Sequence, residues 1–110
     1  MNTRAASALY GETVRNLAGE ILGQIQEIML DLATGRIAYA VLAFGAKQKL
    51  FAIPWTNLKR NEEKNCFILE ADRNKLEIAP GIDRNNWPDM ADSFWGTGVY
   101  RYYDAVPYYI

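Results

Sequence analysis

The stretch that decides the fold covers residues 23–55, GQIQEIMLDLATGRIAYAVLAFGAKQKLFAIPW. Three stretches rich in apolar residues alternate here with two short polar segments, a pattern that predicts three β-strands joined by tight turns. The run contains no group suited to catalysis. It therefore indicates a fold more sharply than it indicates a reaction.

The first of these strands is expected to extend from Ile21, two residues before the quoted stretch, to Asp31. Apolar and polar residues alternate along it with a period of two. The alternation changes phase near residues 26–27, which a β-bulge or a switch of face would explain. Residues 31–36, DLATGR, predict a turn in which Asp31 accepts hydrogen bonds from backbone amides and Gly35 takes the left-handed conformation.

The next segment, residues 37–44, is apolar at every position, which is typical of a strand covered on both faces. A helix is the rival interpretation, but the eight residues between Gly35 and Gly45 are short for one. The outer face of this strand needs a cover, which the C-terminal arm, a short helix or another subunit can provide. We assign to that outer face Ala38, Ala40, Leu42 and Phe44.

Further strands are predicted on both sides of the central run. They cover residues 12–15, 50–53, 59–60 and 66–71, and Pro54 ends the second of them. Six short strands with turns every eight to fifteen residues predict a mostly β fold, a small antiparallel barrel. Closure of the barrel would remove exposed strand edges.

The chain divides into three parts. Residues 1–8 are small and polar, and we expect a flexible N-terminus. Residues 9–81 form the barrel domain, which ends in a short helix from the N-cap Asp72 to about Ile78. Residues 82–110 are aromatic-rich without a sustained period, so we expect an irregular arm with one short helix near residues 89–94.

Composition narrows the class of protein. The 110 residues suit one domain, and the formal net charge of −1 argues against a dedicated nucleic-acid binder, which needs excess lysine and arginine. A single cysteine, Cys66, allows no internal disulfide bond. No segment is apolar enough for a membrane span or a signal peptide, so we expect a cytoplasmic protein.

The chemistry of the side chains speaks against an enzyme. Histidine is absent, which excludes serine–histidine and cysteine–histidine pairs and histidine-bound metals. We expect Cys66 to be a structural thiol. The acidic cluster at residues 83–92 fails the calcium-loop template, because Pro88 stands where that loop needs glycine, and we expect its carboxylates to cap helices and turns. No catalytic residue, cofactor or metal is therefore expected.

The aromatic arm is the best candidate for a binding surface, because tyrosine and tryptophan are enriched at interfaces. Its candidate interface residues are Trp87, Phe94, Trp95, Tyr102 and Tyr103. Two interpretations stay open: these rings cover the chain's own barrel, or they contact a second subunit or a partner protein. With the apolar outer face of residues 37–44, they lead us to expect a homodimer that buries this face or exchanges its arms.

Five short motifs stand in a particular order. They are LYG at residues 9–11, LGQI at 22–25, DLATGR at 31–36, YAV at 39–41 and PW at 54–55. Their order and spacing resemble the PRC-barrel domain family over about residues 9–78, and the tail through residues 86–88, NWP, resembles that of stand-alone bacterial members. That family is similar to the cytoplasmic domain of the photosynthetic reaction-centre H subunit and to the C-terminal domain of the 16S rRNA maturation factor, which binds a ribosomal protein.

Neither of those relatives uses the barrel as an enzyme. The resemblance therefore implies a non-catalytic protein-interaction or assembly module. Its alternative is a ribosome or RNA-processing accessory factor that binds a ribosomal protein. A third possibility, independent of the family, is an enzyme or ligand carrier with a small-molecule pocket at the barrel mouth, although the absence of histidine argues against catalysis.

Overall fold

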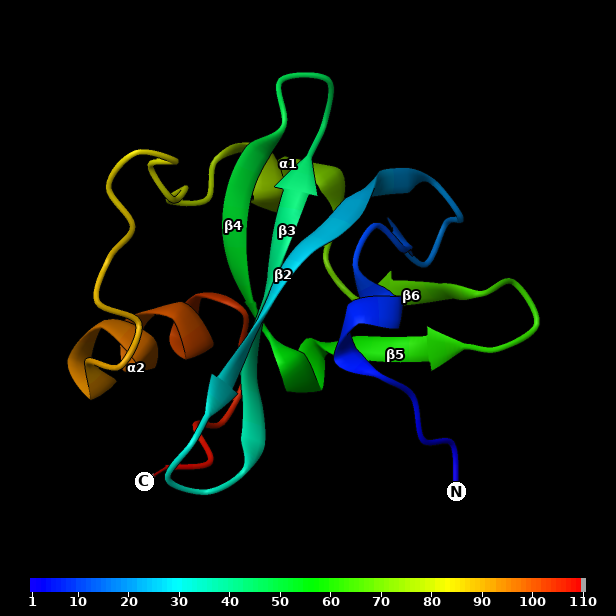
Figure 1. Ribbon diagram of the computed structural model, residues 1–110. Helices are drawn as coiled ribbons and strands as arrows, with labels where there is room; N and C mark the ends of the chain where they lie inside the picture. Colours follow the sequence, from blue (N-terminus) through cyan, green and yellow to red (C-terminus); the bar gives the residue numbers. More distant parts are fainter. Residues whose placement is uncertain (110) are drawn as a thin grey trace.

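The computed structural model describes residues 1–109, and its strands form one mixed sheet in the order β4-β3-β2-β1-β6-β5 (Figure 1). The strands are β1 (Thr13–Arg15), β2 (Ile21–Asp31), β3 (Arg36–Phe44), β4 (Lys49–Pro54), β5 (Leu58–Asn61) and β6 (Cys66–Leu69). The helices are the 3₁₀ helices η1 (Ala6–Leu9) and η2 (Trp55–Asn57) and the α-helices α1 (Arg73–Glu77) and α2 (Ser93–Tyr102). The predicted mostly β fold with six strands is confirmed.

One pairing corrects the expectation of a fully antiparallel barrel. Strand β1 pairs with β2 in the antiparallel sense but with β6 in the parallel sense. The reason is that the β5–β6 hairpin crosses over to the far side of β1, with η2 leading from β4 into it. Strands β4 and β5 are the two edge strands of the sheet and do not pair with each other. The curled sheet is therefore a half-barrel.

The predicted turn and bulge of the central run are confirmed. The register of β2 against β3 shifts between Ile25 and Glu27, which leaves one extra residue in β2. The backbone amide of Ala33 donates to Oδ1 of Asp31 at 3.0 Å, and Gly35 has a φ of 75°. These features depend on local sequence, and this is why sequence patterns locate them.

Gly23 allows β2 and β3 to approach closely at the start of β2. A Cβ atom at this position would collide with the carbonyl oxygen of Ala43 on the paired strand. Glycine is the residue type that permits such a backbone approach within a sheet. The glycine of the LGQI motif is therefore explained by packing.

The sheet buries two apolar clusters, one on each face. We call the cluster on the concave face the inner core, and all six strands contribute to it, with Val14, Leu22, Leu42, Phe51, Leu58 and Phe67 among its members. The second cluster, the outer core, joins β3 and β4 to Ile82 and to Tyr100 of α2. Helix α2 thus covers the convex face of β3 and β4 (Figure 1).

The structure corrects the predicted assignment of residues to the two faces of β3. Ala40, Leu42 and Phe44 lie in the inner core, whereas the outer core contains Tyr39, Val41 and Ala43. Alternation shows which residues share a face, but the direction in which the sheet curls decides which face is concave. Ala38 does lie on the outer side, because the second register shift makes it an extra residue between Ile37 and Tyr39.

The C-terminal arm also differs from its prediction. Its helix is α2, which begins after Asp92 and not near residue 89. Oδ1 of Asp92 accepts a hydrogen bond from the amide of Phe94 at 2.9 Å and so caps the helix. Gly96 and Gly98 lower the intrinsic helix propensity of this segment, and packing on the sheet overrides that local preference.

Candidate functional site: an aromatic groove beside helix α2

A cavity of about 690 Å³ lies between α2 and the segment of residues 80–88. Its lining is mostly apolar and aromatic. We call it the aromatic groove and define it by Ile82, Trp87, Pro88, Trp95, Gly98, Val99 and Tyr102. Tyr103 and Ala52 of β4 also line it.

Residues 80–88 are held in place by backbone bonds. The amide of Ile82 donates to the carbonyl of Leu50 at 2.7 Å, which fixes this segment along the edge of β4. A turn follows, in which Asp83 accepts from the amide of Asn85 at 2.9 Å through Oδ1 and from Asn86 at 3.1 Å through its carbonyl. This turn presents Trp87, and it confirms the structural role expected of Asp83.

Helix α2 supplies the other wall. The Trp95 ring packs edge-on against Tyr39 of β3, with ring centroids 5.5 Å apart. The hydroxyl of Tyr102 donates to the carbonyl of Lys75 at 2.6 Å, which ties the wall to α1. Gly98 has open space where a Cβ atom would stand, so the absence of a side chain leaves room in the groove.

Two large apolar side chains of this region face solvent. Trp87 is 37% exposed, and Phe94, beside Trp95 on α2, is 89% exposed. An exposed aromatic surface next to a preformed groove is a feature of sites that bind other molecules. Chemically, the groove can bury apolar groups and offers few polar ones.

The structure brings together four of the nine predicted interface residues. Trp87, Trp95, Tyr102 and Tyr103 line the groove, whereas Phe94 is exposed and does not line it. Ala40, Leu42 and Phe44 pack inside the inner core, and Ala38 lies partly buried against the outer core. Sequence reasoning missed Ile82, Pro88, Gly98 and Val99, of which only Gly98, a glycine within a helix, carried a signal.

The outer face of β3 is covered by the same chain. Tyr100 is 1% exposed, and its hydroxyl donates to the carbonyl of Ala38 at 2.9 Å. Trp95, Val99, Tyr108 and Tyr109 pack around it. Of the two interpretations of the aromatic arm, packing on the chain's own barrel is the one the structure shows for this face. The homodimer stays a prediction.

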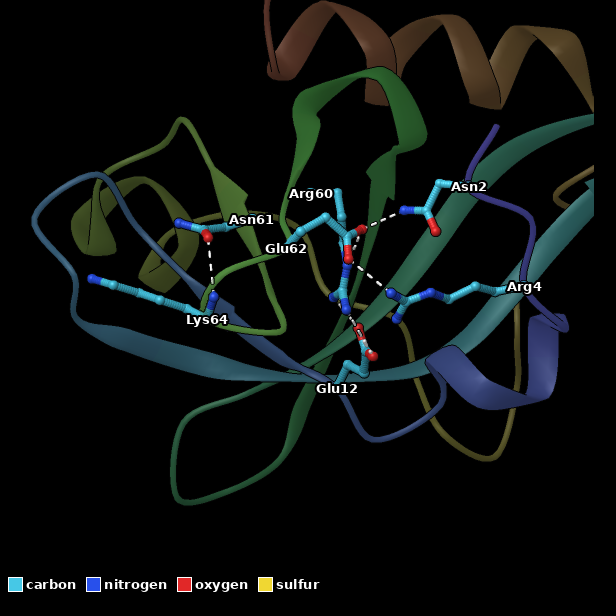
Figure 2. Close-up of polar contacts among 7 residues, drawn as sticks. All are labelled: Asn2, Arg4, Glu12, Arg60, Asn61, Glu62 and Lys64. Atoms are coloured by element: carbon cyan, nitrogen blue, oxygen red, sulfur yellow. Dashed lines mark hydrogen bonds and ion pairs between the residues drawn. The ribbon is translucent and has the colours of Figure 1, made fainter.

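A charged network lies elsewhere, at the N-terminus (Figure 2). The guanidinium of Arg60 on β5 pairs with Glu12, and its Nε donates to Oε1 of Glu62 at 3.2 Å. Glu62 also accepts from Asn2 and pairs with Arg4 at 2.7 Å. The network ties residues 2–4, which were expected to be flexible, to the β5–β6 hairpin. Every charge in it has a partner, so its role is structural.

The buried phenols on and beside α2 are poor proton donors. Burial raises the pKa of Tyr100 to about 12, and it also raises the pKa values of Tyr39 and Tyr103. Cys66 is buried, as expected of a structural thiol. Across residues 1–109, no cluster of three or more cysteine and acidic side chains is arranged to hold a metal ion.

None of the helices in the described part of the chain has the length and apolar character needed to cross a membrane.

A comparison with family models matches residues 1–76 to the PRC-barrel domain. No curated protein matches the chain. The matched residues include all six strands and most of α1. Both walls of the aromatic groove, residues 80–88 and α2, lie beyond the match. The family match thus covers the scaffold, whereas most of the residues that line the groove lie outside the matched part of the chain.

Proposed function

The chain belongs to the PRC-barrel domain family, and from this premise we propose that it is a non-catalytic interaction module that binds an apolar segment of a partner protein in the aromatic groove. The family match supports an interaction or assembly role in general. The groove supplies the place where such a role can be carried out.

The observation that carries this proposal is the pairing of Trp87 with a preformed cavity. Tryptophan and tyrosine contribute the largest energies at protein interfaces, because they bury much area with little loss of rotamer freedom. Trp87 is held by a short turn and is partly exposed before any partner binds. A partner can therefore cover it without a costly rearrangement.

The chemistry of the lining defines the partner. Apolar rings and Gly98 leave space for one or two large apolar side chains, while Asp83 and Asn86 supply a polar rim. We expect a short segment with an exposed leucine, methionine or aromatic residue. Nothing in the groove matches phosphate groups, since no lysine or arginine is among the described residues that line it.

Site-specific photo-crosslinking tests the proposal. A benzoylphenylalanine in place of Trp87 is expected to crosslink the partner in the native host, and the same probe at Leu17 is the control. Leu17 is 75% exposed in the β1–β2 turn and does not line the groove. Mass spectrometry then identifies any protein that is crosslinked by the probe at position 87 and not by the probe at position 17.

Binding of that protein is then measured with purified components. Calorimetry with the Trp87→Ala variant is expected to show a loss of about 2 kcal/mol or more, as for a hot-spot residue. The matched Leu17→Ala variant is expected to bind like the wild type. Equal binding by both variants would reject the groove as the site.

The crosslinking experiment at position 87 also tests whether the chain associates with itself. We expect light scattering at high micromolar concentration to show a dimer if the partner is a second copy, and crosslinking then yields a product of twice the chain mass. A monomer at that concentration, with a different protein captured at position 87, assigns the groove to a heterologous partner.

A further inference from the structure

A second cavity, of about 510 Å³, lies beside the start of α2 and shares no lining residue with the aromatic groove. We call it the tyrosine pocket. Its walls come from the end of β2, from β3, from residues 90–93 and from the C-terminal segment. The size lies within the range of small-molecule sites, roughly 300–1,000 Å³.

Three phenol rings line the tyrosine pocket: Tyr39, Tyr108 and Tyr109. The rings of Tyr108 and Tyr109 stand at 86° to each other with centroids 5.4 Å apart, so they form two adjoining walls. Two thioether side chains, Met29 and Met90, complete a polarisable lining.

Two of the three phenol hydroxyls form hydrogen bonds within the protein. Tyr108 donates to Oδ2 of Asp31 at 2.6 Å, and the Tyr109 hydroxyl lies 3.2 Å from Oγ1 of Thr97. At these two residues, ring carbon and not a free hydroxyl group is therefore what the pocket offers to a ligand.

The charge of the lining is negative. Two carboxylates, Asp31 and Asp92, line the pocket, and none of its described lining residues is lysine or arginine. The hydrogen bond from Tyr108 lowers the pKa of Asp31, which keeps that carboxylate ionised at neutral pH. The guanidinium carbon of Arg36 lies 5.1 Å from the Tyr108 ring centroid, so this ring already has a positive charge over one face.

We propose that the tyrosine pocket binds a small quaternary ammonium ion. Aromatic rings attract such a cation through their negative faces, and two carboxylates add a favourable field. A quaternary ammonium has no N–H group and needs no acceptor, so it suits carboxylates that already accept at Oδ1 from the β2–β3 turn (Asp31) and from the start of α2 (Asp92). This binding is independent of the protein partner proposed for the groove.

The methionines provide the measurement. The chain has three, of which Met29 and Met90 line the pocket, and Met1 is fully exposed at the N-terminus. With ¹³C-methyl methionine, a choline titration followed by NMR is expected to shift the signals of Met29 and Met90 and to leave Met1 unchanged. Its neutral isostere, 3,3-dimethylbutan-1-ol, is expected to bind at least about tenfold more weakly.

Variants separate charge from folding. Asp92→Asn removes one carboxylate but keeps an N-cap side chain, since asparagine caps helices about as well as aspartate. This variant is expected to keep its fold and to weaken choline binding several-fold. Trp87→Ala, in the aromatic groove, is expected to leave choline binding unchanged. Glycine betaine, which carries its own carboxylate, is expected to bind more weakly than choline.

Three results would overturn the proposal. Equal affinity for choline and its neutral isostere would show an apolar cavity that does not select charge. Unshifted Met29 and Met90 signals at choline concentrations on the order of 10 mM would exclude useful affinity. Binding of a trimethyllysine peptide without binding of choline would assign the pocket to a protein ligand. None of these outcomes bears on Trp87, so the two proposals fail separately.

Discussion

The hydroxyl of Tyr108 donates a hydrogen bond to Oδ2 of Asp31 at 2.6 Å and so joins the C-terminal arm to the turn between β2 and β3. Asp31 and Arg36 are the first and last residues of the DLATGR turn. In the structure Tyr108 contacts both: its hydroxyl bonds the carboxylate and its ring lies beneath the guanidinium. One side chain of the C-terminal arm, which lies outside the matched residues, thus completes a turn that belongs to the family's scaffold.

This bond predicts a change in acid stability. Tyr108 is the largest cause of the lowered pKa of Asp31. A carboxylate whose pKa is lower in the folded than in the unfolded state stabilises the protein above its unfolded pKa, and this stability disappears as the pH falls through the folded pKa. Tyr108→Phe is therefore expected to raise the pKa of Asp31 and to reduce the loss of stability in acid.

NMR titration of the Asp31 carboxyl carbon and urea unfolding between pH 2 and 6 check this expectation. A precision of ~0.2 pH units in the measured pKa is enough to detect the shift. Tyr102→Phe serves as the control, because its hydroxyl bonds the carbonyl of Lys75 and not Asp31. An Asp31 pKa that stays the same in Tyr108→Phe would contradict the assigned cause.

A second prediction concerns Gly23. An added Cβ atom would collide with backbone, the carbonyl of Ala43, and backbone in a paired strand cannot move aside easily. Gly23→Ala is expected to destabilise the fold by about 3 kcal/mol or more. Urea unfolding followed by tryptophan fluorescence measures the loss, and a loss below about 1 kcal/mol would show that β2 and β3 can separate at this point.

The two glycines of α2 form a matched pair. A Cβ atom at Gly96 would meet the hydroxyls of Tyr39 and Tyr109, the latter at 2.8 Å, whereas Gly98 has open space. Gly98→Ala is expected to stabilise the protein by about 0.5–1 kcal/mol through helix propensity. Gly96→Ala is expected to destabilise it despite the same propensity gain.

Thermal unfolding of the two variants tests this contrast directly. If both alanines stabilise the protein, α2 does not pack on Tyr39 in solution, and the covered outer face of β3 would need another explanation. Gly98→Ala also narrows the aromatic groove, so weaker partner binding by this more stable variant would separate function from folding.

The fourth prediction concerns the stability of the protein at alkaline pH. Burial raises the pKa of Tyr100 from its ordinary value of 10.0 to about 12. A group with a raised folded-state pKa stabilises the fold below its unfolded pKa, and this contribution is lost as the pH rises from 10.0 to about 12. Tyr100→Phe removes that titration, so its stability is expected to depend less on pH in this range.

Urea midpoints measured across this range, with absorbance at ~295 nm to follow phenolate formation, give the comparison. The variant also loses the hydrogen bond to Ala38 and is expected to be about 1 kcal/mol less stable at neutral pH. If the wild type and the variant lose stability in parallel between these pH values, Tyr100 is not the group that responds.

Sequence patterns predicted the six strands, the bulge near residues 26–27 and the β2–β3 turn, because each depends on neighbours in the chain. They also identified Asp72, whose side chain accepts from the amide of Lys75 at 2.8 Å and caps α1. The predicted position of the helix in the C-terminal arm was wrong. The two glycines of α2 disfavour a helix locally, and the stabilisation that α2 gains by packing on Tyr39 depends on a distant part of the chain.

By itself, then, the sequence determined the strands, their turns and the family to which the scaffold belongs. Only the tertiary structure decided that β6 runs parallel to β1, which face of β3 is concave, and that the chain's own arm covers the other. It also decided that Trp87 and Trp95 share a groove, and that Asp31 and Tyr108 share a pocket. The physical reason is that alternation and turn chemistry act between near neighbours, whereas these arrangements depend on how the sheet curls and which distant side chains then pack together.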